Sequence, residues 1–349
     1  MITGMLAKST TNILSSIFNT FKSNSNTEVT TRSSFALGTI IQLKAFGKSG
    51  SGAIDEAIIM LNNIDNKMSA FKADSEISQI NKNSGLLSQT VSADTYFVIK
   101  KAIEYCRLTE GAFDPTVRPL VNLWNKAFEQ EKIPGESAVK EKLSLVNYRD
   151  IFLDDEKNSV LLIHEGQAID LGGIAKGFAA DQVRDSFIKN GIRNALIDLG
   201  GNIYALGSKP DGSLWKVGIQ NPFCARGQYL GILKVKNKSI VTSGNYEKYI
   251  VKNGKRYHHI LNPRTGYPSE SKIISATIIS DNSLDGDGLS TGIYILGVRK
   301  SLELIESLKG IDAILVTDDK KVFVTSGVNK YFELADSDFS ISEGVDIYE

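Results

Sequence analysis

The chain has 349 residues, 42% of them hydrophobic and 23% charged, and its formal net charge is zero. This size and composition are typical of a soluble globular protein with one large domain or two closely packed ones. The even balance of 40 basic and 40 acidic residues argues against a general nucleic-acid binder. No segment approaches the roughly 18 apolar residues that a transmembrane segment requires. Cys106 and Cys224 form no CxxC pair, and we interpret them as buried free thiols.

Residues 1–33 differ in composition from the rest of the chain. They are rich in Ser, Thr and Asn, contain no acidic residue before Glu28, and place several apolar side chains on one helical stripe. We predict a disordered or targeting tail here, one folded unit over residues 34–335 and a C-terminal tail over 336–349. The tail has neither a secretory apolar segment nor a cysteine that could take a lipid. The compartment therefore stays open: cytoplasmic or organellar if the sequence is complete, periplasmic or membrane-anchored if the protein is exported.

Apolar spacing and turn residues predict the elements of the first half in order. A strand covers residues 35–46, and Asp74, Ser75 and Glu76 form a turn and cap before a short helix to Asn81. The segment 129–142, which contains Pro134, is interpreted as a surface insertion and helix. The other expected elements are helices over 54–68 and 94–109, and a meander of strands over 151–153, 160–163 and 168–171.

The second half begins with a helix over 174–189, which Gly191 ends. We then expect helices over 287–296 and 300–308 and strands over 195–199, 203–205, 215–219, 229–235, 239–242, 273–280, 313–317 and 321–325, the last two forming a hairpin. Strands and helices mix without a regular βαβ alternation. The predicted fold class is therefore α+β, with mixed, largely antiparallel sheets and packed helices.

The segment 170–181 places Gly172, Gly173 and Lys176 where an extended run turns into a helix. Free backbone N–H groups and the helix dipole make such a turn a natural phosphate site. The segment matches neither the P-loop nor the GxGxxG pattern, and the alternative is a turn that serves packing only. A second glycine pair, Gly200 and Gly201, follows a predicted strand and favours a pocket lined by backbone.

Asp287 and Thr291 are four residues apart at a predicted helix start, so their oxygens face the same side. A carboxylate and a hydroxyl suit Mg²⁺, which takes its remaining ligands from water and phosphate. The alternative is an Asp cap with a solvated Thr. An EF-hand is excluded, because the twelfth residue counted from Asp281 is Gly292 rather than Glu.

His258 and His259 lie in a loop with Arg264. A histidine can act as a base near neutral pH, and an arginine can pair with phosphate. Neighbouring extended residues point in opposite directions, so at most one of the two histidines faces a site, and a surface role is the alternative. The GxSxG elbow is absent around Ser243, which disfavours a Ser-His-Asp hydrolase. Phe71 and Tyr246 could each stack on a flat ring or pack in the core.

Over residues 34–330, these segments together resemble the ApbE-type FAD:protein FMN transferases. The resemblance rests on an ordered set of motifs: Leu37-Gly38-Thr39, Met68-Ser69-Ala70-Phe71, Gly111-Ala112-Phe113-Asp114-Pro115-Thr116, the 170–181 segment, Leu199-Gly200-Gly201-Asn202, Thr242-Ser243-Gly244, the double-histidine loop and Asp287-Gly288-Leu289-Ser290-Thr291. The sequence departs from the family at Leu37, often Met; at Asn202 and Asn262, often Asp; and at Gly288, usually Ala. A glycine at that last position is expected to loosen the helix start.

The resemblance implies an enzyme that cleaves FAD at its pyrophosphate and transfers FMN to a Thr or Ser hydroxyl of a partner flavoprotein, releasing AMP. It implies His259 as the base, with His258 as second choice, and Mg²⁺ ligands from the Ala175 carbonyl, Asp287 and Thr291. The implied FAD contacts are Leu37, Ser69, Ala70, Phe71, Asp114, Lys176, Thr242 and Ser243. Two alternatives stay open, an FAD pyrophosphatase that frees FMN and a flavin-binding carrier, although a carrier needs neither metal nor base.

Overall fold

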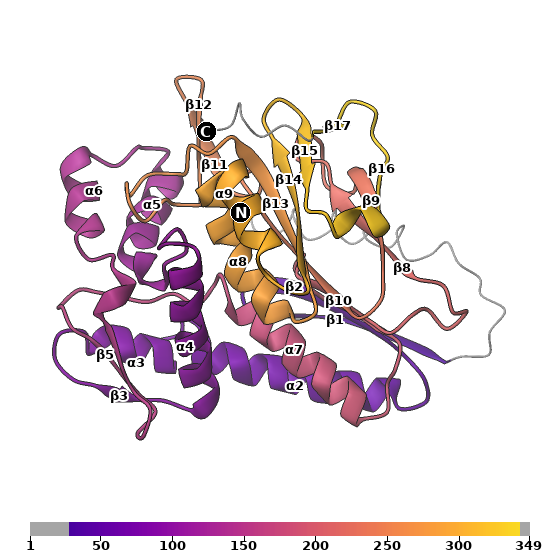
Figure 1. The fold of residues 1–349 in the computed structure, drawn as a ribbon. Helices are drawn as coiled ribbons and strands as arrows, with labels where there is room; N and C mark the ends of the chain where they lie inside the picture. The colour runs from indigo at the N-terminus through magenta and orange to yellow at the C-terminus, as the bar shows by residue number, and fades with distance from the viewer. Residues whose placement is uncertain (1–27, 343–349) are drawn as a thin grey trace, which may run out of the picture.

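A computed structural model describes residues 28–342, and the expected α+β class is confirmed (Figure 1). Within these residues, nine strands form the main sheet in the order β1-β2-β6-β7-β10-β13-β14-β15-β17. All neighbours pair antiparallel except β15 and β17. The strands are β1 (Val29–Ala36), β2 (Thr39–Phe46), β6 (Ala195–Leu199), β7 (Ile203–Leu206), β10 (Lys238–Gly244), β13 (Ile273–Ser280), β14 (Ile311–Thr317), β15 (Lys321–Val324) and β17 (Ser340–Ile341).

Three smaller sheets surround the main sheet. They comprise β16 (Phe332–Leu334), β9 (Tyr229–Val235) and β8 (Trp215–Gln220); β3 (Gln89–Thr90), β5 (Ser159–Leu162) and β4 (Ile151–Asp154); and the hairpin of β11 (Tyr249–Lys252) and β12 (Lys255–His258). The sheet of β8, β9 and β16 packs its apolar side chains on one face of the main sheet, against residues such as Ile240 and Ile279.

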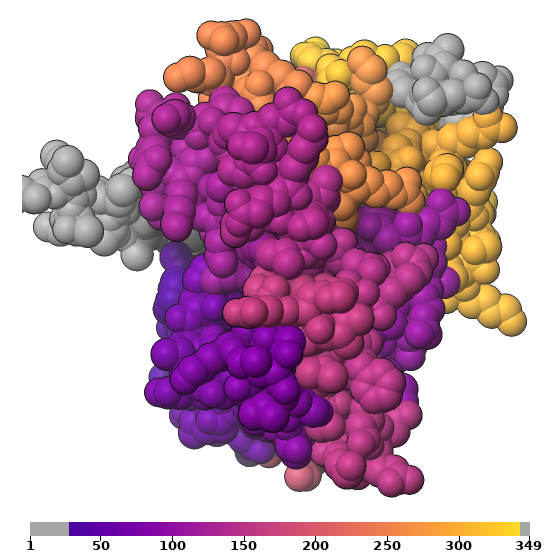
Figure 2. Space-filling view, turned by 90° about the vertical axis from the view of Figure 1, so that its left-hand side faces the viewer, coloured from indigo at the N-terminus to yellow at the C-terminus, as the bar shows by residue number. Residues whose placement is uncertain are grey.

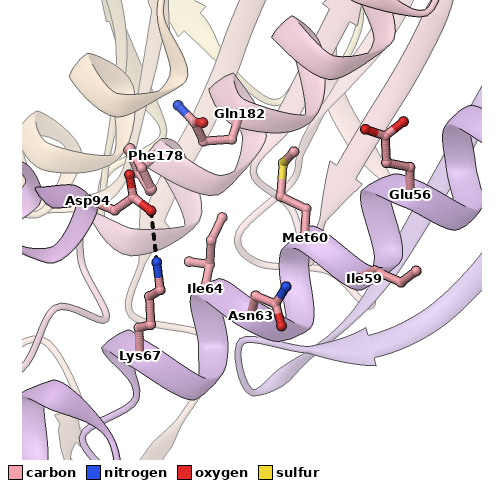
Figure 3. A pocket seen from close by; sticks show the side chains of 9 residues that line it. All are labelled: Glu56, Ile59, Met60, Asn63, Ile64, Lys67, Asp94, Phe178 and Gln182. Atoms are coloured by element: carbon pink, nitrogen blue, oxygen red, sulfur yellow. Dashed lines mark hydrogen bonds and ion pairs between the residues drawn. The ribbon is translucent and has the colours of Figure 1, made fainter. Parts of the chain in front are cut away.

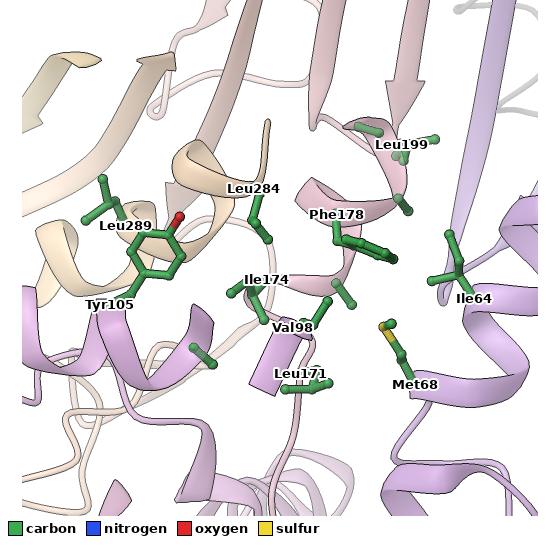
Figure 4. Packing of buried hydrophobic residues seen from close by; sticks show 14 of the residues in the cluster. Ile64, Met68, Val98, Tyr105, Leu171, Ile174, Phe178, Leu199, Leu284 and Leu289 are labelled. Atoms are coloured by element: carbon green, nitrogen blue, oxygen red, sulfur yellow. The ribbon is translucent and has the colours of Figure 1, made fainter. Parts of the chain in front are cut away.

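Helices cover the opposite face of the main sheet (Figure 1). They are α2 (Gly50–Met68), α4 (Ala93–Leu108), α7 (Ala175–Lys189), α8 (Ser283–Leu296) and α9 (Val298–Glu306). Figure 4 shows Phe178 of α7 and Leu284 and Leu289 of α8 meeting side chains from α2 and α4 in one apolar cluster. This burial holds α7 and α8 against each other and against the strands.

The α5–α6 region lies beside the β11–β12 hairpin. Figure 2 shows the surface of α5 (Arg118–Gln130) and α6 (Glu136–Leu143), in magenta, below the orange hairpin. Trp124 of α5 stacks on Tyr257 of β12 with ring centroids 6.0 Å apart. α5 was not predicted, and the expected double-histidine loop is instead a hairpin that ends at His258. The remaining helical turns are α3 (Glu76–Lys82), η1 (Pro115–Val117), η2 (Tyr148–Asp150) and η3 (Val328–Lys330).

The single strand predicted over 35–46 is two strands joined by a turn. The chain already enters a strand at Val29, turns at Leu37 and Gly38, and returns as β2. Leu37 and Gly38 have φ of 52° and 70°, the left-handed conformation that tight hairpin turns require. The ordered chain therefore begins before residue 34. It also continues past 335, because β17 pairs with β15. The expectations for residues 1–27 and 343–349 lie outside the described residues.

Two further predictions need correction. Residues 168–171 are extended but are not a strand, because the Asn81 side chain bonds both the N–H and the carbonyl of Ile169 in place of a neighbouring strand. Cys106 is buried as expected, whereas Cys224 is exposed. The helix at 76–82 does start from Ser75, whose hydroxyl accepts from the Ser78 N–H. Among residues 28–342, no helix is both long and apolar enough to cross a membrane.

Candidate active site at the crossing of α7 and α8

The start of α7 packs directly against the first two turns of α8. Gly177 makes this possible: a Cβ built on it would lie 2.4 Å from the Ser283 carbonyl oxygen and 2.7 Å from Asp287 Cβ. The Gly177 N–H donates to Asp287 Oδ2 over 2.8 Å. The glycine motif and the Asp287 motif, 110 residues apart in sequence, therefore meet at one point.

α8 starts at Ser283, four residues before the predicted start, so Asp287 lies in its second turn. The local residue Asn282 gives the helix no side-chain cap; instead Asp181 of α7 accepts from the N–H groups of Ser283 at 2.8 Å and Leu284 at 2.9 Å. Gly288, the residue after Asp287, faces α4. It makes room for the ring of Tyr105, which would lie 2.4 Å from a Cβ at that residue.

Thr291 lies one turn beyond Asp287, and its hydroxyl joins a group of hydroxyls between α8 and β10. Ser243 Oγ is 3.4 Å from Thr291 Oγ1 and 2.9 Å from Ser290 Oγ. Gly173, just before α7, also approaches this group, since a Cβ on it would lie 3.8 Å from Thr291 Oγ1. Thr242 points to the other face of the sheet, where it bonds Thr277 over 2.8 Å. The side chains of Thr242 and Ser243 therefore do not share one site.

The loop before α7 connects to the predicted ring-stacking residue through Arg118, which the sequence analysis missed. Its guanidinium forms a 2.8 Å ion pair with Asp170 and bonds the Ala70 carbonyl at 3.1 Å. It also lies 4.1 Å from the centroid of the Phe71 ring, whose residue is 75% exposed. The Arg118 guanidinium thus covers one face of the Phe71 ring, and the exposed part of the ring could stack on the ring of a ligand. The sequence feature that could have identified Arg118 is its place directly before Pro119, at the start of a helix.

Asp114 and Lys176 are bonded within the protein. The two Asp114 oxygens accept from the backbone N–H groups of Thr116 and Tyr148, and burial raises the pKa of this carboxyl. Lys176 Nζ donates to the Gly172 carbonyl over 2.8 Å and so folds back on the glycine turn. Ser69 Oγ accepts from the Phe71 N–H, which shapes the loop after α2.

The two histidines have different surroundings. His258 is buried: its Nε2 lies 2.9 Å from the Ser269 carbonyl, its Nδ1 accepts from the Ile260 N–H, and burial lowers its pKa to about 4. His259 is exposed, and its Nδ1 lies 3.3 Å from the Lys248 carbonyl. Although solvent reaches this imidazole, the protein around it lowers its pKa, and the charges of Lys248 and Lys176 act in the same direction.

Arg264, a candidate phosphate partner, contacts the turn after α4. Its guanidinium donates to the Glu110 carbonyl over 2.8 Å.

Tyr246 follows β10 and lines a cavity of about 780 Å³, which Asn245 and Arg256 also line. A smaller cavity of about 320 Å³ lies between α2, α7 and Asp94, and Figure 3 shows its Lys67–Asp94 ion pair. The smaller cavity contains none of the predicted site residues.

Comparison with known proteins identifies the family of this chain. Residues 37–315 match the model of the ApbE family. The chain belongs to the ApbE family. Among the similar proteins are two that are named FAD:protein FMN transferase. The one from Klebsiella pneumoniae is 33% identical, and the match covers 91% of this chain and 98% of that protein. The one from Treponema pallidum is 31% identical, and the match covers 88% of this chain and 90% of that protein.

Solved ApbE structures have the same fold. The ApbE protein of Thermotoga maritima superposes with a TM-score of 0.80 at 29% identity, covering 87% of this chain and 99% of that one. The flavin transferase ApbE of Vibrio cholerae gives a TM-score of 0.78 at 27% identity over the same shares. The predicted fold and family are confirmed.

Proposed function

We propose that this ApbE-family chain is an FAD:protein FMN transferase that moves FMN from FAD onto a Thr or Ser hydroxyl of a partner flavoprotein. The names of its relatives support the reaction class. The observation that carries the proposal is the meeting of Asp287 with the Gly177 N–H, with the Thr291 hydroxyl one turn away. This places hard oxygen donors beside a glycine-rich helix start, where a pyrophosphate would bind.

The residues at the crossing fit a magnesium ion. Asp287 is buried, and the Gly177 N–H bonds its Oδ2 atom. Among residues 28–342 no hydrogen bond to Oδ1 is seen, so Oδ1 is available to a metal ion. Asp287, Thr291 and the Ala175 carbonyl would hold the ion with oxygen donors alone, as Mg²⁺ prefers. Bound there, Mg²⁺ would offset the negative charge that develops on the phosphates.

His259 is better placed than His258 to act as the base. Both His258 nitrogens are used by backbone partners, whereas the His259 contact to Lys248 involves Nδ1 and leaves Nε2 open. Its lowered pKa keeps the imidazole neutral at pH 7, so Nε2 can accept a proton.

The proposed step exchanges one P–O bond for another and moves one proton. The acceptor hydroxyl oxygen attacks the FMN phosphorus, its proton passes to His259 Nε2, and the bond to the bridging oxygen breaks with its electron pair going to AMP. Lys176, whose Nζ lies at the glycine turn, would bind the same phosphates, and Phe71, which Arg118 covers on one face, would stack on the flavin ring.

The experiment compares AMP release from FAD and Mg²⁺ with and without a candidate flavoprotein. A transferase releases AMP in step with covalent flavin on the partner, which survives denaturation and adds the mass of an FMN phosphoester. Free FMN with every partner would instead identify a pyrophosphatase. FAD binding without any AMP would identify a carrier.

A further inference from the structure

The two helices at the crossing hold each other by a reciprocal set of hydrogen bonds. The Gly177 N–H of α7 donates to Asp287 of α8, and the Ser283 and Leu284 N–H groups of α8 donate to Asp181 of α7. Asp181 is four residues after Gly177, and Ser283 is four residues before Asp287. The two contacts therefore lie one turn apart on each helix, on the faces that meet.

Asp181 replaces the cap that α8 lacks in its own sequence. At the start of α8, the Asp181 carboxylate accepts from two N–H groups that have no partner within the helix, and its negative charge complements the helix dipole. The two Asp181 oxygens bind two successive N–H groups of α8. They therefore fix both the rotation of α8 about its own axis and the distance between α8 and α7. That rotation decides where the Asp287 carboxylate points.

Arg184 holds the Asp181 side chain in place. Its Nη1 lies 2.8 Å from Asp181 Oδ1 and 3.3 Å from the side-chain oxygen of Asn282, the residue before α8. The Asp181 carboxylate is buried and has this cationic partner, so the charge is compensated where it lies.

We infer that Asp181 is a positioning residue for the metal site: by capping α8 from α7, it sets the orientation of Asp287 toward Mg²⁺ without touching the ion. The inference rests on the proposed function, because it assumes that Asp287 is a metal ligand. Groups that orient metal ligands typically change metal affinity by 10–100-fold when they are lost.

The test is Asp181→Asn, which keeps the side-chain shape but presents an NH₂ group to one of the two helix N–H groups. Mg²⁺ is titrated against the protein with FAD present, and its binding is followed by the rise in Tm and, separately, by the transfer rate. We expect both Mg²⁺ midpoints to increase by about tenfold or more, while kcat at saturating Mg²⁺ stays near that of wild type.

Asp312→Asn is the matched control. Asp312 likewise accepts two hydrogen bonds, in its case from the hydroxyls of Thr325 and Tyr331, but it lies in β14 and outside the crossing. It should lower the Tm without metal and leave the Mg²⁺ midpoints unchanged. If Asp181→Asn does not fold, Arg184→Gln, which leaves the carboxylate but removes its anchor, should shift both midpoints in the same direction.

An Asp181→Asn protein with wild-type midpoints, or with a reduced kcat and wild-type midpoints, overturns the inference. Asp287→Ala identifies which premise has failed. If wild type and Asp287→Ala respond identically to Mg²⁺, the metal site itself is wrong and the inference fails with it. If Asp287→Ala loses the response and Asp181→Asn keeps it, only the positioning role is wrong.

Discussion

At the scale of single residues, the burial of each side chain separates the chemical candidates from the structural ones. The neighbouring histidines have the same sequence signal, yet His258 is enclosed by backbone partners and His259 is exposed. Sequence alternation predicts that they point apart, but only packing decides which one faces inward. Arg118 was missed in the sequence because its role depends on contacts with Ala70 and Asp170, which are distant in sequence.

Replacing His259 by Ala should slow FMN transfer by roughly 10²–10⁴-fold, the usual contribution of a positioned base. FAD affinity should change little, because the imidazole acts on the acceptor hydroxyl. Single-turnover transfer and FAD titration measure the two effects. His164→Ala, an exposed histidine outside the crossing, serves as the control. Wild-type transfer rates in His259→Ala would contradict the assignment.

His258 should make the stability of the protein depend on pH. Its pKa is about 4 when folded and near 6.5 when unfolded, so the unfolded state binds more protons between these values. The free energy of unfolding should thus fall by up to about 3 kcal/mol as the pH drops from 6.5 to 4. Denaturant titrations of wild type and His258→Gln measure this difference. Equal slopes against pH in both proteins would show that folding does not lower the pKa of His258.

At the scale of elements, the crossing of α7 and α8 depends on glycines that bring backbones together. Gly177 faces the α8 backbone, Gly288 faces Tyr105 of α4, and Gly292 faces Thr109, the residue after α4. α8 therefore lies closer to its neighbours than a helix with ordinary side chains could. This proximity, rather than a flexible backbone, explains why a Gly stands at 288.

Gly177→Ala should destabilise the protein by about 1–3 kcal/mol, because its methyl group would collide with the Ser283 carbonyl. Gly52→Ala is the matched control, since it lies in α2 with open space around a Cβ. It should stabilise the helix by up to about 1 kcal/mol. Urea unfolding of both variants measures the difference. A Gly177→Ala protein as stable as Gly52→Ala would mean that the helices do not approach as described.

The sequence was sufficient for elements with a regular apolar pattern, such as α2, α4 and α7, and for the motifs that carry the family resemblance. It failed where a distant residue sets the boundary. α8 starts four residues early because Asp181 caps it, and residues 168–171 stay out of a sheet because Asn81 takes their hydrogen bonds. The missed α5 contains Pro119, which is tolerated in a first helical turn.

At the scale of the whole molecule, the main sheet connects the two ends of the described chain to the site. β1 forms one edge and β17 the other, with β10 and β13 under α8 between them. The Arg32–Asp55 ion pair and the hydrogen bond from Arg32 to the Ser51 hydroxyl join the first strand to α2. Residues 29–33, first assigned to a tail, thus belong to the fold.

Truncation should show where the fold begins. A chain that starts at Ser34 loses the pairing of Val29 through Ser33 with β2, whereas one that starts at Glu28 keeps it. The shorter chain should melt at least about 4 °C below the longer one, since small losses of free energy shift Tm by a few degrees. Differential scanning calorimetry compares the two. Equal melting temperatures would contradict the contribution of β1.

The most direct measurement is the intact mass of an acceptor flavoprotein after incubation with FAD, Mg²⁺ and either wild-type enzyme or Asp287→Ala. Asp287 joins the start of α7 to the proposed metal, and metal charge stabilisation is worth several kcal/mol in such reactions. The account predicts a covalent FMN adduct with wild type that is lost with excess EDTA and is nearly absent with a folded Asp287→Ala. An equal adduct from Asp287→Ala, or full transfer in EDTA, would contradict it.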